Sequence, residues 1–392
     1  MGERDRSMSR DHWIEGRHYR TGEPVAVRIA GGVVAEIIKP ELERPEADLP
    51  WLAPGLTDLQ INGYRGRDFN TLPFDEEMVR DITRELWAEG VTSYFPTVIT
   101  NAPEAIREAV ATIARACSRY AEVAGCIAGI HVEGPFISPE DGPRGAHDRS
   151  FVRPPDWDLF RRWQEAAEGR IKIITVSPEW AEAPDFIEKC ADSGVTVSIG
   201  HTKATSEQIR DAVRAGARLS THLGNGAHPV LPRHPNYIWD QLAEDALSAC
   251  LIADGFHLPP AFIRTALRVK GDKAMLVSDA VSLSGMPPGT YETNIGGKVV
   301  KSPEGKLHLA EQPAILAGSA QMLLWGIERL VAGGLCSLPG AWDMASIRPA
   351  SFMNLPQAGG LAEGAPADLV LFRREGDRLV LEQTYKRGDA ML

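Results

Sequence analysis

The chain has 392 residues, of which 43% are hydrophobic and 24% are charged, with 42 Lys and Arg against 53 Asp and Glu. This composition excludes an intrinsically disordered chain, and the length favours one large domain with a smaller satellite. The formal charge of -11 disfavours non-specific binding to nucleic acid or to anionic membranes, although it allows a local basic pocket for an anionic substrate.

Residues 1–20 are charged and lack the apolar core of a signal peptide. No later run approaches the roughly 20 apolar residues that a membrane span needs. The five cysteines are scattered and form no C-x-x-C pair, so the pattern indicates neither a disulfide framework nor a cysteine metal site. We therefore expect a cytoplasmic protein with reduced thiols.

Short strand-like segments occur near both ends of the chain. The candidate strands are residues 25–29, 33–38, 367–372 and 378–382. The first two flank Gly31 and Gly32, which is the signature of a hairpin. We predict that residues 1–53 and 357–392 pair into one small β-sandwich domain, with residues 54–356 inserted between them.

Between residues 54 and 356, apolar strand-length runs alternate with amphipathic helical stretches, the pattern of repeated βα units on a parallel sheet. The eight candidate strands are residues 55–61, 91–99, 126–132, 171–176, 195–199, 218–221, 248–253 and 274–278. Helices fit between most of them, for example at 76–89, 103–120, 184–193, 206–215 and 260–269. This α/β pattern favours a (β/α)8 TIM-like barrel, with a doubly wound open sheet as the alternative.

Almost every predicted strand ends in a residue that can bind a metal or move a proton, at the edge where barrel enzymes build their sites. Glu133, His201 and His222 supply one carboxylate and two imidazoles, a set that holds zinc and leaves one position for water. Such an ion lowers the pKa of the water and polarises a carbonyl. Asp279 follows the eighth strand and would carry a proton from the water to the departing amine.

Each of these residues alone is weak support. A single histidine at a strand end is usually a satisfied polar residue, and Glu133 alone would be a helix cap or an ion-pair partner. The four together at four strand ends are hard to explain as structure, because burying them unpaired in a barrel mouth is unfavourable. The pattern therefore predicts a metal site.

Six motifs appear in the order found in N-acetylglucosamine-6-phosphate deacetylases of the amidohydrolase superfamily, which the chain resembles over nearly its whole length. They are residues 131–136 (HVEGPF), 200–202 (GHT), 221–225 (THLGN), 254–257 (DGFH), 277–280 (VSDA) and 316–319 (LAGS). The resemblance implies that Glu133, His201 and His222 are the metal ligands. It also implies that Asp279 is the general base and acid.

The resemblance extends to pocket residues. His147 is similar to the family residue that helps to polarise the acetyl carbonyl, with a solvated loop histidine as the alternative. Asn225 and His257 are similar to residues that hold the sugar phosphate, and Gln60 to one near the metal. The implied substrate contacts are Gln60, Asn225, Gly226, Arg233, His257 and Leu316.

The metal count follows from the first strand. Many amidohydrolases carry His-x-His there and bind a second metal, whereas this chain has Gln60 and Asn62. Neutral amides are poor zinc ligands. The resemblance to deacetylases with the same Gln-x-Asn pattern therefore implies one divalent metal per subunit, Zn2+ first, with Fe2+ or another divalent ion as the alternative.

Two loops depart from the family pattern. After His222 the family usually carries Leu, an aromatic residue, Asn, Ala and Met, whereas residues 223–228 read LGNGAH. The family's Arg-Glu-Pro-Gly, whose arginine contacts the phosphate from the neighbouring subunit, is replaced by RHPN at 233–236. Arg233 is either a substitute phosphate ligand or an ordinary solvated arginine. These departures concern the substrate and leave the metal chemistry untouched.

We therefore predict a metal-dependent amidohydrolase that removes the N-acetyl group of an amino sugar, with N-acetylglucosamine 6-phosphate as the first substrate. The alternatives within this class are N-acetylgalactosamine 6-phosphate, an unphosphorylated N-acetyl sugar or another N-acyl amine. A catalytically inactive scaffold barrel is the alternative from a different class. By resemblance we expect a homodimer, and we expect no nucleic-acid or membrane partner.

Overall fold

The computed structural model describes residues 11–42, 45–293, 297–313 and 315–391. The chain divides into two compact units, each built from segments that are far apart in sequence. One unit comprises Met1–Asp58, Arg84–Ser93 and Ile327–Leu392, and the other comprises Leu59–Thr83 and Tyr94–Gly326. The predicted domain boundaries near residues 54 and 356 stay a prediction.

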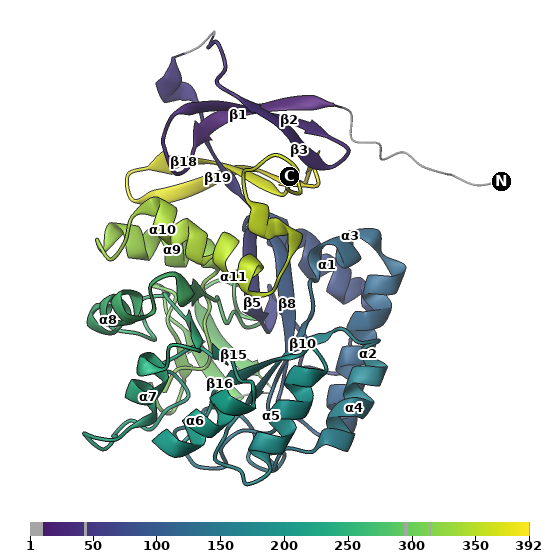
Figure 1. Cartoon of the computed structure of the whole chain (residues 1–392), viewed down its shortest axis with the longest axis vertical. Coiled ribbons are helices and arrows are strands. Elements are labelled where there is room, and N and C mark those ends of the chain that lie inside the picture. The colour runs from purple at the N-terminus through teal and green to yellow at the C-terminus, as the bar shows by residue number, and fades with distance from the viewer. Residues whose placement is uncertain (1–10, 43–44, 294–296, 314, 392) are drawn as a thin grey trace, which may run out of the picture. The chain divides into compact units, whose positions relative to one another are not determined.

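A seven-stranded sheet in the first unit joins the two ends of the chain, in the order β20-β19-β18-β4-β1-β2-β3. Its strands are β1 (His12–His18), β2 (Pro24–Ala30), β3 (Val33–Ile38), β4 (Trp51–Pro54), β18 (Leu369–Glu375), β19 (Arg378–Lys386) and β20 (Asp389–Ala390). Because β4 pairs antiparallel with β18, the prediction that both ends form one β domain is confirmed. Figure 1 shows the purple N-terminal strands beside the yellow C-terminal ones.

Local sequence explains this sheet. Gly31 and Gly32 have φ angles of 60° and 80°, which a two-residue turn between twisted strands requires. Alternate apolar side chains of the strands pack into one core, in which Val27, Leu52 and Leu369 are fully buried. Burying each such side chain contributes about 1.5–3 kcal/mol to folding.

The second sheet is the barrel, with eight strands in the order β14-β13-β12-β11-β10-β9-β8-β5. They are β5 (Leu56–Ile61), β8 (Val91–Ile99), β9 (Ile130–Glu133), β10 (Ile171–Val176), β11 (Thr196–Ile199), β12 (Leu219–Ser220), β13 (Ser248–Leu251) and β14 (Ala274–Leu276). All pairings from β8 to β14 are parallel. A parallel bridge from Ile61 to Ala280 brings the first strand to the chain beyond the last. The predicted barrel is confirmed, and the open-sheet alternative is wrong.

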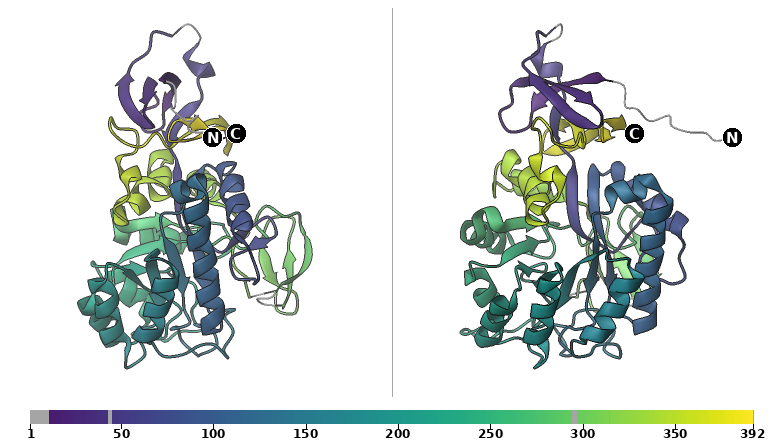
Figure 2. Two further views of the ribbon diagram at one scale, coloured as in Figure 1. Left: turned by 90° about the vertical axis from the view of Figure 1, so that its right-hand side faces the viewer. Right: turned by 45° about the vertical axis from the view of Figure 1, so that its right-hand side comes forward.

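Within the second unit, helices lie outside the parallel strands (Figure 2). The helices of both units are α1 (Glu76–Trp87), α2 (Pro103–Arg119), α3 (Ala121–Cys126), α4 (Trp157–Ala166), α5 (Ala183–Asp192), α6 (Ser206–Ala215), α7 (Tyr237–Ala243), α8 (Pro260–Lys270), α9 (Leu323–Ala332), α10 (Leu338–Met344) and α11 (Ile347–Phe352). Thr205 caps α6 in a reciprocal capping box with Gln208, so this helix begins at the residue predicted. None of the helices in the described residues is both long and apolar enough to cross a membrane.

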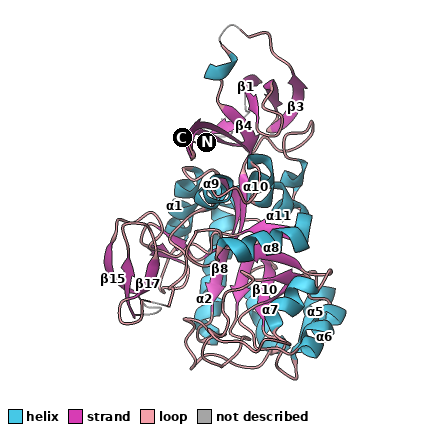
Figure 3. Ribbon diagram, turned by 90° about the vertical axis from the view of Figure 1, so that its left-hand side faces the viewer, coloured by secondary structure: helices cyan, strands magenta, loops and turns pink. Residues whose placement is uncertain are grey.

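Some elements differ from the prediction. The third barrel strand was predicted over residues 126–132, but β9 begins at Ile130, and Cys126 is the last residue of α3. A separate three-stranded antiparallel sheet consists of β15 (Gly289–Thr293), β16 (Gly297–Lys301) and β17 (Leu307–Leu309). Figure 3 shows this sheet apart from the barrel strands. A short hairpin of β6 (Gly63–Tyr64) and β7 (Arg67–Asp68) follows β5.

Candidate active site

The predicted polar residues gather where the parallel strands end. Gln60 lies in β5 and Glu133 is the last residue of β9. His201 and His222 follow β11 and β12, and Asp279 follows β14. The side chains of Gln60, Glu133 and both histidines are buried, whereas Asp279 is partly exposed. The parallel topology therefore brings residues from five strands to one edge of the barrel.

Three of these residues have strained main chains. His201, His222 and Asp279 have φ angles of 47°, 25° and 49°, in the left-handed region that residues with a Cβ seldom adopt. Such a conformation costs about 1–3 kcal/mol and persists only where the surrounding structure holds it, most often at functional sites. The strain therefore marks the same strand ends as the sequence pattern.

The carboxylate and the two imidazoles form a compact triangle. Oε1 of Glu133 lies 3.0 Å from Nε2 of His222 and 3.3 Å from Nε2 of His201. The two Nε2 atoms are 3.1 Å apart. In a tetrahedral zinc site with bonds of about 2.0–2.2 Å, ligand atoms are separated by about 3.3 Å. The donor set and its spacing fit a divalent metal.

The tautomer of His201 supports this fit. Its Nδ1 donates to the carbonyl oxygen of Pro143 at 2.8 Å, so the Nε2 lone pair faces the triangle. Gly226 packs against the same ring, because a Cβ at this position would lie 2.7 Å from Nδ1. Its φ of 58° also favours glycine. The predicted substrate contact Gly226 therefore lies against a candidate ligand.

Electrostatics couple the three groups. Burial opposes the ionisation of Glu133, but the adjacent His201 and His222 side chains hold the pKa of this carboxyl well below its usual value. The pKa of His222 is raised, since the adjacent Glu133 carboxylate outweighs the effect of burial. Positive charge is therefore strongly favoured at the centre of the triangle, which is the place where a metal would sit.

Two amides hold the carboxylates. Gln60 donates from Nε2 to Oε1 of Glu133 and to Oδ1 of Asp279, both at 3.0 Å. Asn62 donates from Nδ2 to the same Oδ1 of Asp279 at 2.8 Å. Burial raises the pKa of Asp279 above the usual value. The nearby Glu133 carboxylate also raises this pKa, whereas His222 lowers it by less than the other two effects together raise it. Asp279 is therefore fixed in orientation and binds a proton more readily than a solvated aspartate.

His147 lies beside the triangle. Its side chain is 6% exposed, so the alternative of a solvated loop histidine is wrong. Burial, with a contribution from His201, lowers the pKa of His147 to about 3, which leaves the ring uncharged at neutral pH. Glu133, His147 and His201 each offer a ligand atom, and these atoms lie within 4.8 Å of one another. His147 is thus within reach of either a metal or a substrate held there.

Sequence reasoning missed Thr100, whose Oγ1 lies 2.8 Å from Nδ1 of His147. Thr100 directly follows β8, so the rule that found the other residues, a polar side chain at a strand end, applies to it too. A threonine is a weak indicator of a functional site, because its hydroxyl often forms a hydrogen bond to nearby main-chain groups instead.

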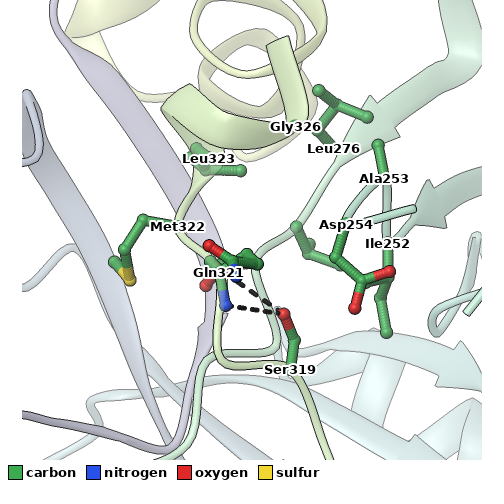
Figure 4. Close-up of a pocket in the computed structure, with 11 residues that line it drawn as sticks. Ile252, Ala253, Asp254, Leu276, Ser319, Gln321, Met322, Leu323 and Gly326 are labelled. Carbon is green, nitrogen blue, oxygen red and sulfur yellow. Dashed lines mark hydrogen bonds between the residues drawn. The ribbon is translucent and has the colours of Figure 1, made fainter. Parts of the chain in front are cut away.

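His257 forms a buried pair with Asp254. Nδ1 of His257 lies 2.7 Å from Oδ2 of Asp254. Burial raises the pKa of Asp254, yet the hydrogen bond from His257 holds it below its usual value. Asp254 also lines a small pocket with Ser319 and Gln321, which are hydrogen-bonded to each other (Figure 4). The main chain of Ser319 in turn donates to the carbonyl of Asp279, so this pocket adjoins the site.

The remaining predicted contacts have other surroundings. Asn225 donates from Nδ2 to the carbonyl of His222 at 3.2 Å and so stabilises its own turn. Arg233 is exposed, and its guanidinium has no hydrogen-bond or ion-pair partner in the described part of the chain, although its carbonyl oxygen accepts from Asn236. Leu316 pairs with His308 through an isolated antiparallel bridge. The structure therefore brings together Gln60, Glu133, His147, His201, His222 and Asp279.

Known proteins resemble this chain over most of its length. The sequence profile of the amidohydrolase family matches residues 51–389. An N-acetylglucosamine-6-phosphate deacetylase of Lysinibacillus sphaericus is 31% identical over 371 residues, which cover 93% of each chain. An N-acetylgalactosamine-6-phosphate deacetylase of Shewanella sp. (strain ANA-3) is 33% identical over 362 residues, covering 89% of this chain and 87% of that relative.

A solved structure agrees with these relatives. An N-acetyl-D-glucosamine-6-phosphate deacetylase variant from Mycobacterium smegmatis, in complex with N-acetyl-D-glucosamine-6-phosphate, matches with a TM-score of 0.84 and 28% identity. The match covers 97% of this chain and 99% of that one. Fold and site together define a barrel hydrolase with a candidate metal site of one carboxylate and two imidazoles. The chain belongs to the amidohydrolase family, among its N-acetylglucosamine-6-phosphate deacetylases, and is a hydrolase of amide bonds.

Proposed function

We propose that this enzyme hydrolyses N-acetylglucosamine 6-phosphate to glucosamine 6-phosphate and acetate. The observation that carries the proposal is the link through Gln60, whose amide joins the Glu133 carboxylate of the triangle to Asp279. Gln60 thus lies between the proposed metal ligands and the proposed proton carrier. The M. smegmatis relative, solved with this sugar phosphate bound, supports the substrate.

We assign Glu133, His201 and His222 as the residues that would hold one divalent metal, Zn2+ first and Fe2+ as the alternative. A bound ion of this kind activates water for attack and polarises the scissile carbonyl. One ion per subunit is proposed because Gln60 and Asn62 use their amides as donors to carboxylates, and neutral amides are poor zinc ligands.

Asp279 would take a proton from the attacking water and return it to the amine nitrogen as the C–N bond breaks. Both amides that hold Asp279 donate to Oδ1, so we assign the proton to Oδ2. The raised pKa suits this exchange, because a general base is most effective when its pKa approaches the working pH.

His147 would donate a hydrogen bond from Nε2 to the acetyl oxygen, where negative charge develops during attack. Its uncharged ring can donate from one nitrogen without giving up the proton. For the sugar phosphate we assign His257, whose Nδ1 side is occupied by Asp254, so that its Nε2 side is left to face an anion. The proposed substrate contacts are Gln60, Asn225, Gly226, Arg233, His257 and Leu316.

We further propose a homodimer in the cytoplasm. The exposed guanidinium of Arg233, without a partner in the described residues, suits a role as a phosphate ligand offered to a second subunit. Sugar phosphates are confined to the cell interior because their charge prevents passage through a bilayer. The partner is thus a small anionic amino sugar, and no nucleic acid or membrane is involved.

A second substrate is favoured by one observation. The Shewanella relative named N-acetylgalactosamine-6-phosphate deacetylase is 33% identical to this chain. The two sugars differ in the configuration of one hydroxyl, and the proposed metal ligands do not distinguish between these configurations. An unphosphorylated N-acetyl sugar and another N-acyl amine are the further alternatives within the class.

Acetate release from N-acetylglucosamine, N-acetylgalactosamine and their 6-phosphates, with zinc-loaded protein, tests the proposal. We expect the highest kcat/KM for N-acetylglucosamine 6-phosphate, and a loss of about 100- to 10,000-fold in Asp279→Asn. A preference for the galactosamine epimer would replace the first substrate by the second. Absence of acetate from all four sugars would favour the inactive scaffold.

A further inference from the structure

We propose that Thr100 is a positioning residue whose hydroxyl donates to Nδ1 of His147 and thereby places the ring proton on Nε2, the nitrogen that meets the substrate carbonyl. The proposal rests on the proposed function, in which His147 donates to the acetyl oxygen. It assigns the orientation and tautomer of this histidine to a residue in a different βα unit.

The contact is short and buried. Oγ1 of Thr100 lies 2.8 Å from Nδ1 of His147, and the two residues are only 5% and 6% exposed. The carbonyl oxygen of His147 accepts from Arg144 at 2.6 Å, which holds the main chain of this loop. Both ring and hydroxyl are therefore fixed, and bulk water does not compete for the bond.

The hydroxyl proton has two acceptors within reach. Nδ1 of His147 is at 2.8 Å, whereas the carbonyl oxygen of Glu133 is at 3.5 Å. A hydroxyl carries one proton, and a hydrogen bond weakens steeply toward the longer distance. The proton of Thr100 is therefore directed to Nδ1, which must then accept with its lone pair.

The other side of the ring favours the same tautomer. An uncharged imidazole carries its single proton on one nitrogen, so a lone pair on Nδ1 requires N–H at Nε2. Nε2 lies 3.9 Å from Oε2 of Glu133, and a carboxylate favours an N–H dipole that points toward it. Thr100 and Glu133 thus act together on the His147 ring from opposite sides.

The opposite tautomer would change the chemistry of the site. If Nδ1 carried the proton and donated to Thr100, Nε2 would present a lone pair toward the Glu133 and His201 ligand atoms. His147 would then be a further metal ligand and could not donate to a carbonyl oxygen. The Thr100 hydroxyl therefore decides between two functions of one side chain.

Gly134 confines the hydroxyl. A Cβ at this position would lie 2.2 Å from Oγ1 of Thr100, and the φ of 81° also favours glycine. The chain that follows the candidate ligand Glu133 therefore packs directly against Thr100. This contact keeps the hydroxyl between the ligand strand and the His147 ring.

The test compares Thr100→Val, which removes the hydroxyl at nearly constant volume, with Thr100→Ser, which retains it. Thr97→Val is the matched control, because Thr97 is a buried threonine of β8, the strand that Thr100 follows, and its hydroxyl donates to the carbonyl of Phe95. All proteins are full-length and zinc-loaded, with metal content measured. Histidines are labelled with 15N, and the His147 signals are assigned by their loss in His147→Gln.

We expect the wild type, Thr100→Ser and Thr97→Val to show the proton of His147 on Nε2. Thr100→Val should lose this single tautomer and about 10- to 100-fold in kcat, with KM within about twofold and metal content unchanged. A proton on Nδ1 in the wild type would overturn the proposal even if Thr100→Val does not fold. Unchanged kcat in a folded Thr100→Val would overturn it as well.

The tautomer is read without turnover, so the two proposals can fail separately. A wild type that releases no acetate from any of the four sugars contradicts the proposed function, whatever the NMR spectrum shows. An active wild type with the proton on Nδ1 retains the function and removes the role of Thr100.

Discussion

The side-chain amide of Asn62 donates to Oδ1 of Asp279 at 2.8 Å. Next to this contact, Ile61 and Ala280 form the parallel bridge between the first strand and the chain beyond the last. The orientation of the proposed proton carrier therefore depends on the closure of the barrel. The side-chain amides of Gln60 and Asn62 donate hydrogen bonds to the Asp279 carboxylate, and these bonds replace the water contacts that the carboxylate loses on burial.

Replacing Asn62 by Ala should slow catalysis more than it weakens binding. The change removes a hydrogen bond to a charged group, worth about 1.5–3 kcal/mol, which corresponds to about a 10- to 100-fold lower kcat. KM and metal content should change little, because the Asn62 amide donates to Asp279 and not to one of the three proposed metal ligands. Steady-state kinetics with metal analysis would check this, and an unchanged kcat would remove Asn62 from the account.

The pH dependence of kcat/KM should show an acid limb caused by Asp279. The carboxylate accepts a proton only when ionised, so activity is present above its pKa and is lost as the pH falls through it. Since burial and Glu133 raise this pKa, the loss should begin at a higher pH than for an ordinary aspartate of pKa about 3.9. A pH–rate profile of the wild type tests this, and activity that stays constant down to pH 4 would exclude such a base.

Metal removal should destabilise the protein. A ligand present at a thousandfold excess over its Kd adds about 4 kcal/mol to the stability of the folded state, so chelation should lower Tm by several degrees. His222→Ala should bind little metal, so chelation should not lower its Tm further. His228→Ala is the matched control, because His228 bonds to Tyr237 and Glu140 outside the triangle. Calorimetry with elemental analysis would test this, and equal metal content in both variants would argue against the assigned ligands.

Asp254→Asn should affect phosphorylated substrates selectively. The substitution keeps the side-chain shape but removes the charge that accepts from Nδ1 of His257. A charge-assisted hydrogen bond is roughly twice as strong as a neutral one, so KM for the 6-phosphate should rise about tenfold. Kinetics with the 6-phosphate and with the unphosphorylated sugar would separate the effects. An equal change for both sugars would mean that His257 does not bind the phosphate.

Much of the fold could be predicted because its signals are local. The eight barrel strands are apolar runs, and all six residues of β5 and all four of β9 are buried, as expected for parallel strands covered on both faces. The short strands β15 to β17 were not predicted, since three to five residues of mixed polarity carry no reliable period. The third strand was predicted to begin at Cys126, which is the last residue of α3, because Cys126 and the residues that follow it are apolar or small in either structure.

The candidate site could be predicted in part. Polar residues at the ends of parallel strands must converge, so Glu133, His201 and His222 could be grouped without coordinates. The contact between Thr100 and His147 depends on how the loop after β9 returns to the barrel, which no local pattern specifies. The packing of Gly226 against His201 could not be predicted for the same reason, because it depends on how two separate loops meet.

Anomalous diffraction at the zinc edge from crystals of the zinc-loaded protein would show whether Glu133, His201 and His222 bind the metal. We predict one ion per subunit, at about 2.0–2.2 Å from a carboxylate oxygen of Glu133 and from Nε2 of both His201 and His222. Asp279 should lie beside the ion without binding it. An ion held by His147 in place of His222, or no anomalous signal at these residues, would contradict the account.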